Sequence, residues 1–111
     1  IGVGETFSLG QNLGLDPEKL FEILSTSTGS CWSINNYCPI KGVGPISPAD
    51  NNFKPGFSAD LMLKDLTIAL KAIEDTGTSA PFGKHSQENF KKMVRENQGS
   101  LDFSAITNFN E

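Results

Sequence analysis

The sequence has few of the residues from which metal centres are built. Its 111 residues include two cysteines and one histidine. Cys31 and Cys38 lie seven positions apart, and His85 is distant from both, so these side chains do not match a metal-binding motif. We therefore predict no metal site. We interpret the cysteines as ordinary reduced thiols, with a disulfide between them as the alternative.

Positive charge and long apolar runs are also scarce. Nine Lys and Arg stand against thirteen Asp and Glu, which gives a net charge of −4. The chain has no basic stripe, which argues against nucleic-acid binding, and no apolar run long enough to span a bilayer. No secretory signal is present, and the chain opens at Ile1 instead of Met. We therefore expect a fragment or an isolated domain of a longer protein.

No segment shows the sustained alternation of apolar and polar residues that marks a half-buried strand. Helical patterns separated by Gly and Pro fill the chain instead, apart from a long loop over 39–55 that contains four prolines. The sequence predicts a single all-α domain of four to six helices. The expected helices cover about 1–13, 17–24, 58–76, 81–98 and 102–106.

Residues typical of helix ends support these boundaries. Asp16 followed by Pro17 is a typical helix start, and Ser58 is a plausible N-cap. Gly14 and Gly77 are suited to the left-handed position that follows a helix. The glycines of the first helix weaken it, but they also permit another helix to approach closely. Several apolar side chains are expected to face the core, namely Leu20, Ile23, Leu24, Phe82, Phe90, Met93, Val94, Phe103, Ile106 and Phe109.

The helix expected over 58–76 has the clearest apolar pattern. Its apolar residues cover so much of its circumference that we expect it to be packed on most sides, in a core or between subunits. Asp65 falls inside this apolar arc, with no Lys or Arg three or four positions away. A buried carboxylate without a partner is unfavourable, which makes Asp65 a candidate for function or for an interface. Lys64 lies on the polar strip, where pairing with Asp60 is the simplest interpretation.

The aromatic residues leave two interpretations open. Trp32 and Tyr37, the only residues of their kinds, either belong to the core or line a cleft, and the core interpretation is the more common outcome. Phe57 precedes the Ser58 cap and is suited to a hydrophobic staple. Ser30 and Ser33 have no nearby His and carboxylate, so a hydrolase triad has no support.

Several short motifs, taken in order, resemble the C-terminal domain of the β-hydroxyacid dehydrogenases, a family with a 6-phosphogluconate dehydrogenase-like fold, and within it the 3-hydroxyisobutyrate dehydrogenases. The resemblance extends over essentially the whole chain. Cys-Trp-Ser and the spacing of Asn-Asn-Phe to Gly-Phe are its most discriminating parts. The motifs are Gly-Leu-Asp at 14–16, Ser-Thr-Gly-Ser-Cys-Trp-Ser at 27–33, Asn-Asn-Phe at 51–53, Gly-Phe at 56–57, Leu-Met-Leu-Lys-Asp-Leu at 61–66 and Asp-Phe-Ser at 102–104.

The resemblance implies roles for five residues. Lys64 matches the family lysine that reaches the nicotinamide end of the cofactor. Asp65 matches a supporting carboxylate beside the active site. Phe57 matches an aromatic residue of the substrate-pocket wall, and Trp32 and Tyr37 match the aromatic stretch that closes this pocket.

The resemblance also implies an activity. The full enzyme would use NAD, bound mainly by an N-terminal Rossmann domain that is absent here, to oxidise a small β-hydroxyacid to its semialdehyde in valine breakdown. The main catalytic lysine would lie upstream of Ile1, so we expect this chain alone to be inactive. The family forms dimers or tetramers, and its location would be the mitochondrial matrix in a eukaryote and otherwise the cytoplasm. The alternatives are a related semialdehyde or glyoxylate reductase, including a tartronate semialdehyde reductase, and a non-catalytic helical oligomerisation module.

Overall fold

The computed structural model describes residues 1–109, and all regular secondary structure in this range is helical. Residues 1–109 contain no strand, and the only β-type pairing there is an isolated bridge between Ser58 and Asp102. The expectation of an all-α chain with four to six helices is confirmed. The α-helices are α1 (Gly2–Asn12), α2 (Pro17–Ser25), α3 (Trp32–Asn35), α4 (Ala59–Thr76) and α5 (Pro81–Arg95), and two 3₁₀ helices are η1 (Pro48–Asn51) and η2 (Phe103–Phe109).

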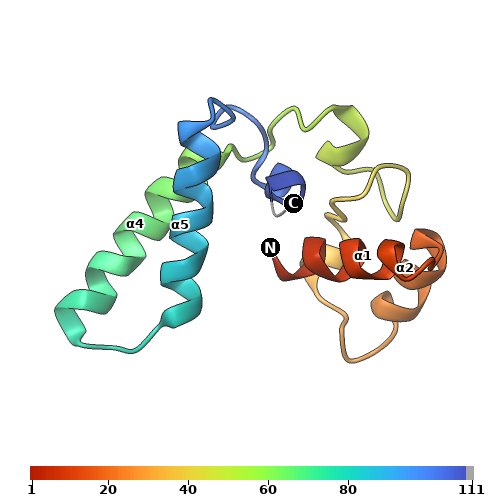
Figure 1. Cartoon of the computed structure of the whole chain (residues 1–111), viewed down its shortest axis with the longest axis horizontal. Helices are drawn as coiled ribbons and strands as arrows, with labels where there is room; N and C mark the ends of the chain where they lie inside the picture. Colours follow the sequence, from red (N-terminus) through yellow and green to blue (C-terminus); the bar gives the residue numbers. More distant parts are fainter. Residues whose placement is uncertain (110–111) are drawn as a thin grey trace.

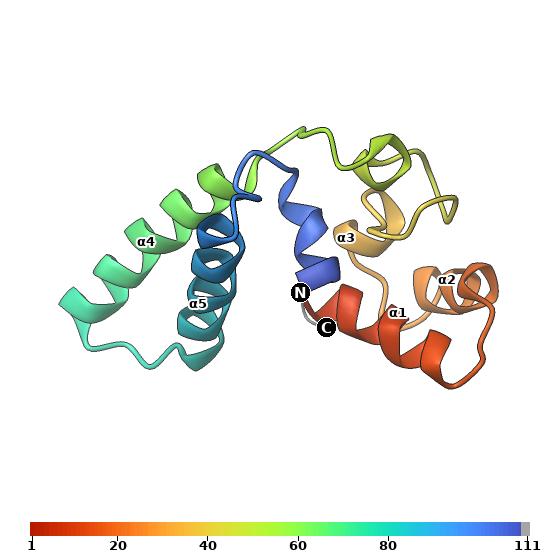
Figure 2. The ribbon, with the colours of Figure 1, turned by 45° about the horizontal axis from the view of Figure 1, so that its top comes forward.

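The helices form two arms. The first arm contains α1, α2 and α3, and the second is the antiparallel hairpin of α4 and α5 (Figure 1). Between the arms lies η2, which contacts α1, α4 and α5, and the N-terminus lies beside it (Figures 1 and 2). Each arm has its own small core. Phe7, Cys38 and Val43 fill the first, and Ala59, Phe90, Met93, Ala105 and Ile106 fill the junction of the second with η2.

The predicted helix ends agree with the structure. The Asp16 side chain accepts a hydrogen bond from the Glu18 N–H at 2.9 Å at the start of α2. Ser58 accepts one from the Leu61 N–H at 3.3 Å at the start of α4. Gly14 and Gly77 follow α1 and α4 with φ of 81° and 67°, values that favour glycine. These signals are local, which is why the sequence alone could predict them.

Polar caps organise the long loop, within which the sequence did not predict η1. The Asp50 carboxylate accepts hydrogen bonds from the backbone N–H groups of Gly42 at 2.7 Å and Ser47 at 2.9 Å. These bonds, with a smaller effect of the Lys41 charge, hold the pKa of Asp50 below its ordinary value. The Ser47 hydroxyl is buried and donates to the Cys38 carbonyl at 2.7 Å. The loop is therefore an ordered part of the first arm.

The expectation that α4 is packed on most sides is wrong within this chain. The side of α4 that faces α5 and η2 is partly covered through Met62, Leu63 and Leu66, whereas Leu61 is 45% exposed and Ile68 is 60% exposed. A hairpin of two helices covers only the stripe at which they meet, so the rest of a wide apolar arc stays open.

None of the described helices is both long enough and apolar enough to cross a membrane.

Two further expectations of burial are wrong. Ile23 on α2 is 64% exposed and Phe82 at the start of α5 is 88% exposed. The elements that pack against α2 and α5 leave these two positions uncovered. The other members of both stripes are partly or fully buried, including Leu20, Leu24, Phe90 and Met93.

Of the cysteines, Cys31 is exposed and Cys38 is buried, and both are free thiols.

The glycines of α1 permit close packing, as predicted. A Cβ atom on Gly4 would lie 2.5 Å from Thr107 Oγ1, and one on Gly10 would lie 2.5 Å from Leu20 Cδ2. The Gly4 contact is the more restrictive, because Thr107 is β-branched and stiff. This close approach connects α1 to η2 and thereby connects the two arms.

We predict that Gly4→Ala lowers the free energy of unfolding by about 1–3 kcal/mol, because the added methyl group overlaps Thr107. Gly2→Ala is the matched control, since a Cβ there meets no atom within 4 Å. The control should change stability by less than about 0.5 kcal/mol or increase it slightly. Urea denaturation of both variants measures the difference. Equal stabilities would show that the approach of α1 to η2 is not tight.

Candidate functional site

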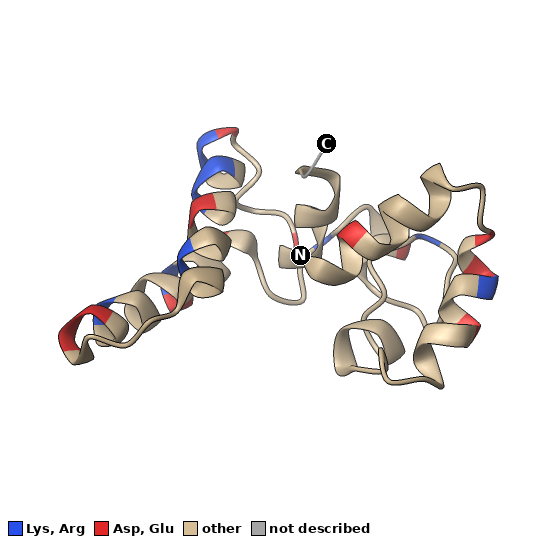
Figure 3. Ribbon diagram, turned by 60° about the horizontal axis from the view of Figure 1, so that its bottom comes forward, with Lys and Arg blue, Asp and Glu red and all other residues tan. Residues whose placement is uncertain are grey.

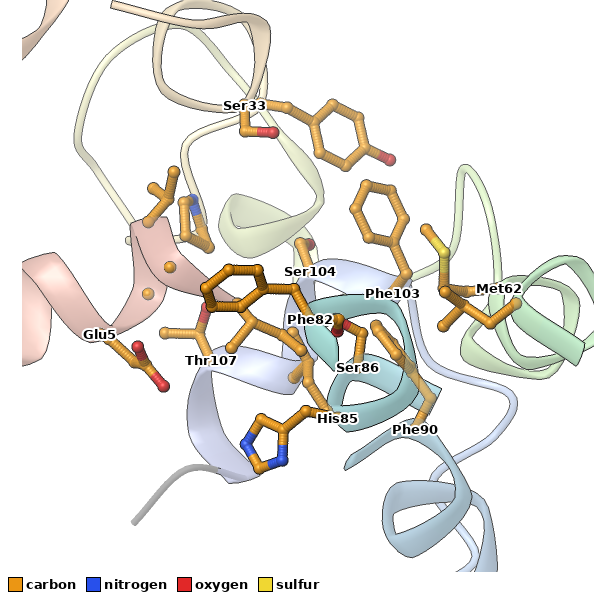
Figure 4. Close-up of a pocket in the computed structure, with 18 residues that line it drawn as sticks. Glu5, Ser33, Met62, Phe82, His85, Ser86, Phe90, Phe103, Ser104 and Thr107 are labelled. Carbon is orange, nitrogen blue, oxygen red and sulfur yellow. The ribbon is translucent and has the colours of Figure 1, made fainter. Parts of the chain in front are cut away.

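A cavity of about 800 Å³ lies between the two arms. Its wall is mainly apolar and also includes a few hydroxyl groups, His85 and Glu5 (Figure 4). Phe82 is highly exposed and also lines it, which indicates an open groove. The lining residues belong to the first turn of α1, to Ser33, Tyr37 and Pro39, to Met62 and Leu66 of α4, to the first half of α5, and to η2.

Four aromatic residues, which we call the aromatic wall, stack beside this cavity: Trp32, Tyr37, Phe103 and Phe57. The Trp32 and Tyr37 ring centroids are 4.7 Å apart, with planes inclined by 22°. Tyr37 and Phe103 are nearly parallel at 5.3 Å, and Phe57 meets Phe103 edge-on at 6.2 Å. These are favourable geometries for aromatic pairs. The structure thus brings together all three predicted pocket residues, with Phe103 between them.

The cleft interpretation describes Tyr37, whereas Trp32 lies outside both the core and the lining of the cavity. Trp32 is 57% exposed, and Tyr37 is half-buried and lines the cavity. Trp32 begins the short α3 and Tyr37 follows its end, so one turn of chain presents both rings on one side. The third predicted residue, Phe57, comes from the segment that enters α4.

A buried carboxylate anchors the aromatic wall. Asp102 is fully buried, and its Oδ2 atom accepts hydrogen bonds from Tyr37 Oη at 2.8 Å, Gly56 N at 3.0 Å and Phe57 N at 3.1 Å. Its Oδ1 atom accepts from Ser104 Oγ at 2.6 Å and Ser104 N at 2.9 Å. Five donors satisfy the charged group in place of water, as a buried carboxylate requires.

Backbone hydrogen bonds bring these donors to Asp102. The Phe103 N–H donates to the Phe57 carbonyl and the Asp102 N–H to the Phe53 carbonyl, both at 2.8 Å. These bonds hold the segment before α4 against the segment before η2. Asp102, which precedes η2, can therefore reach backbone N–H groups that lie 45 and 46 positions earlier in the chain.

The environment of Tyr37 keeps its hydroxyl protonated. Burial, followed by the hydrogen bond to Asp102 and the charge of that carboxylate, raises the pKa of Tyr37 well above its ordinary value of 10.0. The phenol proton is donated to Asp102 and is not available to a reacting group. Tyr37 is therefore suited to forming a wall and unsuited to proton transfer at neutral pH.

Lys64 and Asp65 lie apart from the aromatic wall. Both are exposed on α4, and neither lines the cavity. The exposure of Lys64 agrees with its place on the polar strip, but the expected pair with Asp60 is not among the ion pairs of residues 1–109. The expectation that Asp65 is buried is wrong, because the half of the apolar arc that contains it is the half that α5 leaves open.

The sequence analysis did not identify Asp102 as the centre of the site. Asp102 appeared there only as the start of the last helix and as part of a family motif. An acidic residue between Leu101 and Phe103 with Ser104 two positions later was the available signal, since Asp often binds a backbone N–H two residues on. Among residues 1–109, no group of three or more His, Cys, Asp or Glu is placed to hold a metal ion.

Comparison with known proteins places the chain in a family. A family model described as "NAD-binding of NADP-dependent 3-hydroxyisobutyrate dehydrogenase" matches residues 1–109. The chain belongs to this family. The resemblance drawn from the sequence motifs is thereby confirmed.

Individual relatives agree with this assignment. A probable 3-hydroxyisobutyrate dehydrogenase of Mycobacterium tuberculosis is 43% identical over 106 residues, which cover 96% of this chain and 36% of the relative. The mitochondrial 3-hydroxyisobutyrate dehydrogenase of Homo sapiens is 37% identical over 109 residues, 98% of this chain and 32% of that protein. The chain thus spans about a third of the length of these relatives.

Solved structures show the same fold. A Mycobacterium tuberculosis 3-hydroxyisobutyrate dehydrogenase with L-serine superposes with a TM-score of 0.93 at 41% identity, over 99% of this chain and 38% of that one. A 3-hydroxyisobutyrate dehydrogenase from Salmonella typhimurium gives a TM-score of 0.80 at 17% identity, over 96% of this chain and 35% of that one, a likeness in fold alone. The helical architecture is therefore that of 3-hydroxyisobutyrate dehydrogenase structures.

We predict that Tyr37 titrates well above pH 10 in the folded chain and near pH 10 in urea. Because the sequence contains a single tyrosine, the tyrosinate absorbance band reports this group alone. Folding raises the pKa of Tyr37, so the protonated phenol stabilises the folded state. This stabilisation is fully present below about pH 10 and is lost as the pH rises further. A folded-state titration close to pH 10 would contradict the Tyr37–Asp102 hydrogen bond.

Proposed function

We propose that this chain is the helical domain of an NAD-dependent 3-hydroxyisobutyrate dehydrogenase-like oxidoreductase, which converts the hydroxyl of a small β-hydroxyacid to a semialdehyde in valine breakdown. The observation that carries the proposal is the aromatic wall. The family resemblance assigns Trp32, Tyr37 and Phe57 to the substrate pocket. Trp32 stacks on Tyr37, Phe103 lies between Tyr37 and Phe57, and Tyr37 and Phe103 line the cavity. A dry aromatic surface suits hydride transfer because it keeps water from the reacting centre.

The residues of this chain fit one end of a nicotinamide dinucleotide. In this proposal Lys64 contacts the cofactor through its ammonium group, which suits a phosphate, ribose or amide oxygen. Lys64 is exposed and takes part in none of the ion pairs described for residues 1–109, so its charge is available to a ligand. A nicotinamide cofactor bound there would supply the hydride acceptor for the oxidation of the substrate hydroxyl. The choice between NAD and NADP belongs to the dinucleotide-binding domain, which we propose lies in the rest of the protein.

Asp65 has a supporting role in this proposal. Its exposed carboxylate is suited to orienting the catalytic lysine that the family resemblance places elsewhere in the full protein, and to stabilising its charge. The position of Asp65 on the open side of α4 supports this role, since a group that acts across a domain boundary has to face out of its own domain. This chain alone is then inactive.

The same open side supports assembly. Leu61 and Ile68 are exposed apolar side chains on one helix, a pattern typical of surfaces that contact another protein. We propose that α4 contributes to a homodimer or homotetramer. Lys and Arg are interspersed with Asp and Glu along the hairpin (Figure 3). The relatives from Homo sapiens and Arabidopsis thaliana are named as mitochondrial, which supports the matrix as the location in a eukaryote and the cytoplasm otherwise.

Activity of the full-length protein tests the proposal. We expect the full-length protein to reduce NAD with 3-hydroxyisobutyrate, as followed by NADH absorbance, and the 111-residue chain alone to give no turnover. L-serine and glycerate as alternative hydroxyacids with NAD, and glyoxylate with NADH in the reverse direction, separate the proposed substrate from those of related reductases. Turnover by the chain alone would contradict the assignment as a supporting domain.

Single substitutions test the two charged residues. In the full-length protein, Lys64→Ala should raise the KM for the cofactor roughly 10- to 100-fold, the loss expected for a hydrogen bond to a charged group. Asp65→Asn should lower kcat by about tenfold with a smaller effect on the cofactor KM. Lys71→Ala is the control, because Lys71 is on the same helix but pairs with Asp75. Equal cofactor KM values for the Lys64 and Lys71 variants would exclude a cofactor role for Lys64.

A further inference from the structure

We infer that Asp102 is a positioning residue for the substrate pocket, which fixes the aromatic wall from behind without touching the substrate. The inference rests on the proposed function for its consequence in catalysis. It goes beyond that function by naming the group that sets the shape of the pocket. The observations that carry it are the contacts of one carboxylate oxygen and the space around one glycine.

One oxygen of Asp102 holds two parts of the aromatic wall at the same time. Oδ2 accepts from the Tyr37 hydroxyl at 2.8 Å and from the Phe57 N–H at 3.1 Å. These donors come from different arms and lie 20 positions apart in the chain (65 and 45 positions from Asp102). Because both bonds end on a single atom that is fully buried, the positions of Tyr37 and Phe57 relative to one another are fixed.

Gly56 provides the space that this arrangement needs. A Cβ atom on Gly56 would lie 2.8 Å from Tyr37 Oη and 3.8 Å from Asp102 Oδ2. Gly56 is not among the glycines with positive φ, so the absence of a side chain is required by space and not by backbone conformation. The Tyr37 hydroxyl therefore occupies a notch between Gly56 and Asp102, and the depth of this notch sets how far the Tyr37 ring extends toward the cavity.

Phe103 extends the effect to the rest of the aromatic wall. It follows Asp102 directly, and its N–H donates to the Phe57 carbonyl at 2.8 Å. Its ring lies between those of Tyr37 and Phe57, and Trp32 in turn stacks on Tyr37. A shift of Tyr37 therefore moves the surface that all four rings present, although only Tyr37 touches Asp102 through its side chain.

A purely structural role for Asp102 predicts a different result from the same variants. If the carboxylate only holds the fold together, loss of its partners lowers stability and leaves substrate recognition as it was. If it positions the aromatic wall, recognition changes at temperatures at which the protein is fully folded. Asp102→Asn exchanges an acceptor for a donor that faces the N–H groups, and this variant can fail to fold. The decisive variants are therefore Tyr37→Phe and Gly56→Ala.

The experiment compares these variants in the full-length enzyme, with 3-hydroxyisobutyrate and with 3-hydroxypropionate, which lacks the methyl group. Tyr37→Phe keeps the ring and removes the bond to Asp102, and Gly56→Ala pushes the hydroxyl out of its notch. We expect each to raise the KM for 3-hydroxyisobutyrate about three- to tenfold, to change the ratio of the two KM values, and to change kcat less. Ser47→Ala is the matched control, because it removes a buried hydrogen bond in the first arm that lies outside the aromatic wall.

The inference fails if both wall variants lose thermal stability to the same degree as Ser47→Ala but keep both KM values. An additional measurement separates this failure from a failure of the proposed function. Trp32 stacks on Tyr37, so the difference in emission between the full-length enzyme and its Trp32→Phe variant reports the wall without any substrate. If wild-type enzyme oxidises neither substrate, the proposed function is wrong. A Trp32 emission that then differs between Gly56→Ala and Ser47→Ala supports the positioning of the wall, and identical spectra overturn it.

Discussion

The burial of one negative charge is the constraint on which the rest of this structure depends. Asp102 has no exposed surface, and an isolated carboxylate in such a place would be strongly unfavourable. The fold meets this demand with donors from the end of α3, from the segment before α4 and from η2. Segments that are distant in the sequence are thus brought to one point. The junction between the arms forms around that point, and the aromatic wall forms on its surface.

This constraint explains why the chain holds its shape with two small cores. Each arm buries only a few side chains, and α1 approaches η2 closely because Gly4 has no side chain. The open sides of α2, α4 and α5 carry Ile23, Ile68 and Phe82 to the solvent. Exposed apolar residues on three helices favour contacts with further protein, in agreement with relatives about three times as long as this chain.

The sequence predicted what is encoded locally. Helix starts at Asp16 and Ser58 and the ends at Gly14 and Gly77 depend on neighbouring residues, so they could be predicted without knowledge of the fold. The predicted pocket residues Trp32, Tyr37 and Phe57 came from a family resemblance, because their convergence depends on packing between segments that no local pattern describes. The exposure of Asp65 could not be predicted, since periodicity identifies the apolar side of a helix but not which part of it a neighbour covers. The role of Asp102 was missed for a similar reason, as three of its five donors lie 45 or more positions away and reach it only through tertiary structure.

The positions of the candidate groups suggest a division of roles within the proposed enzyme. The aromatic wall is held in place by contacts inside this chain, whereas Lys64 and Asp65 face outward from α4. A wall that excludes water has to be rigid before the substrate arrives, and contacts within one domain provide this rigidity. Charged groups that meet a cofactor held by another domain have to be free until the domains come together. On the proposed function, this chain contributes a preformed apolar surface and two charges whose partners lie outside it. The rigid part of the site is therefore the part that sequence patterns alone identify least well, because it depends on Asp102.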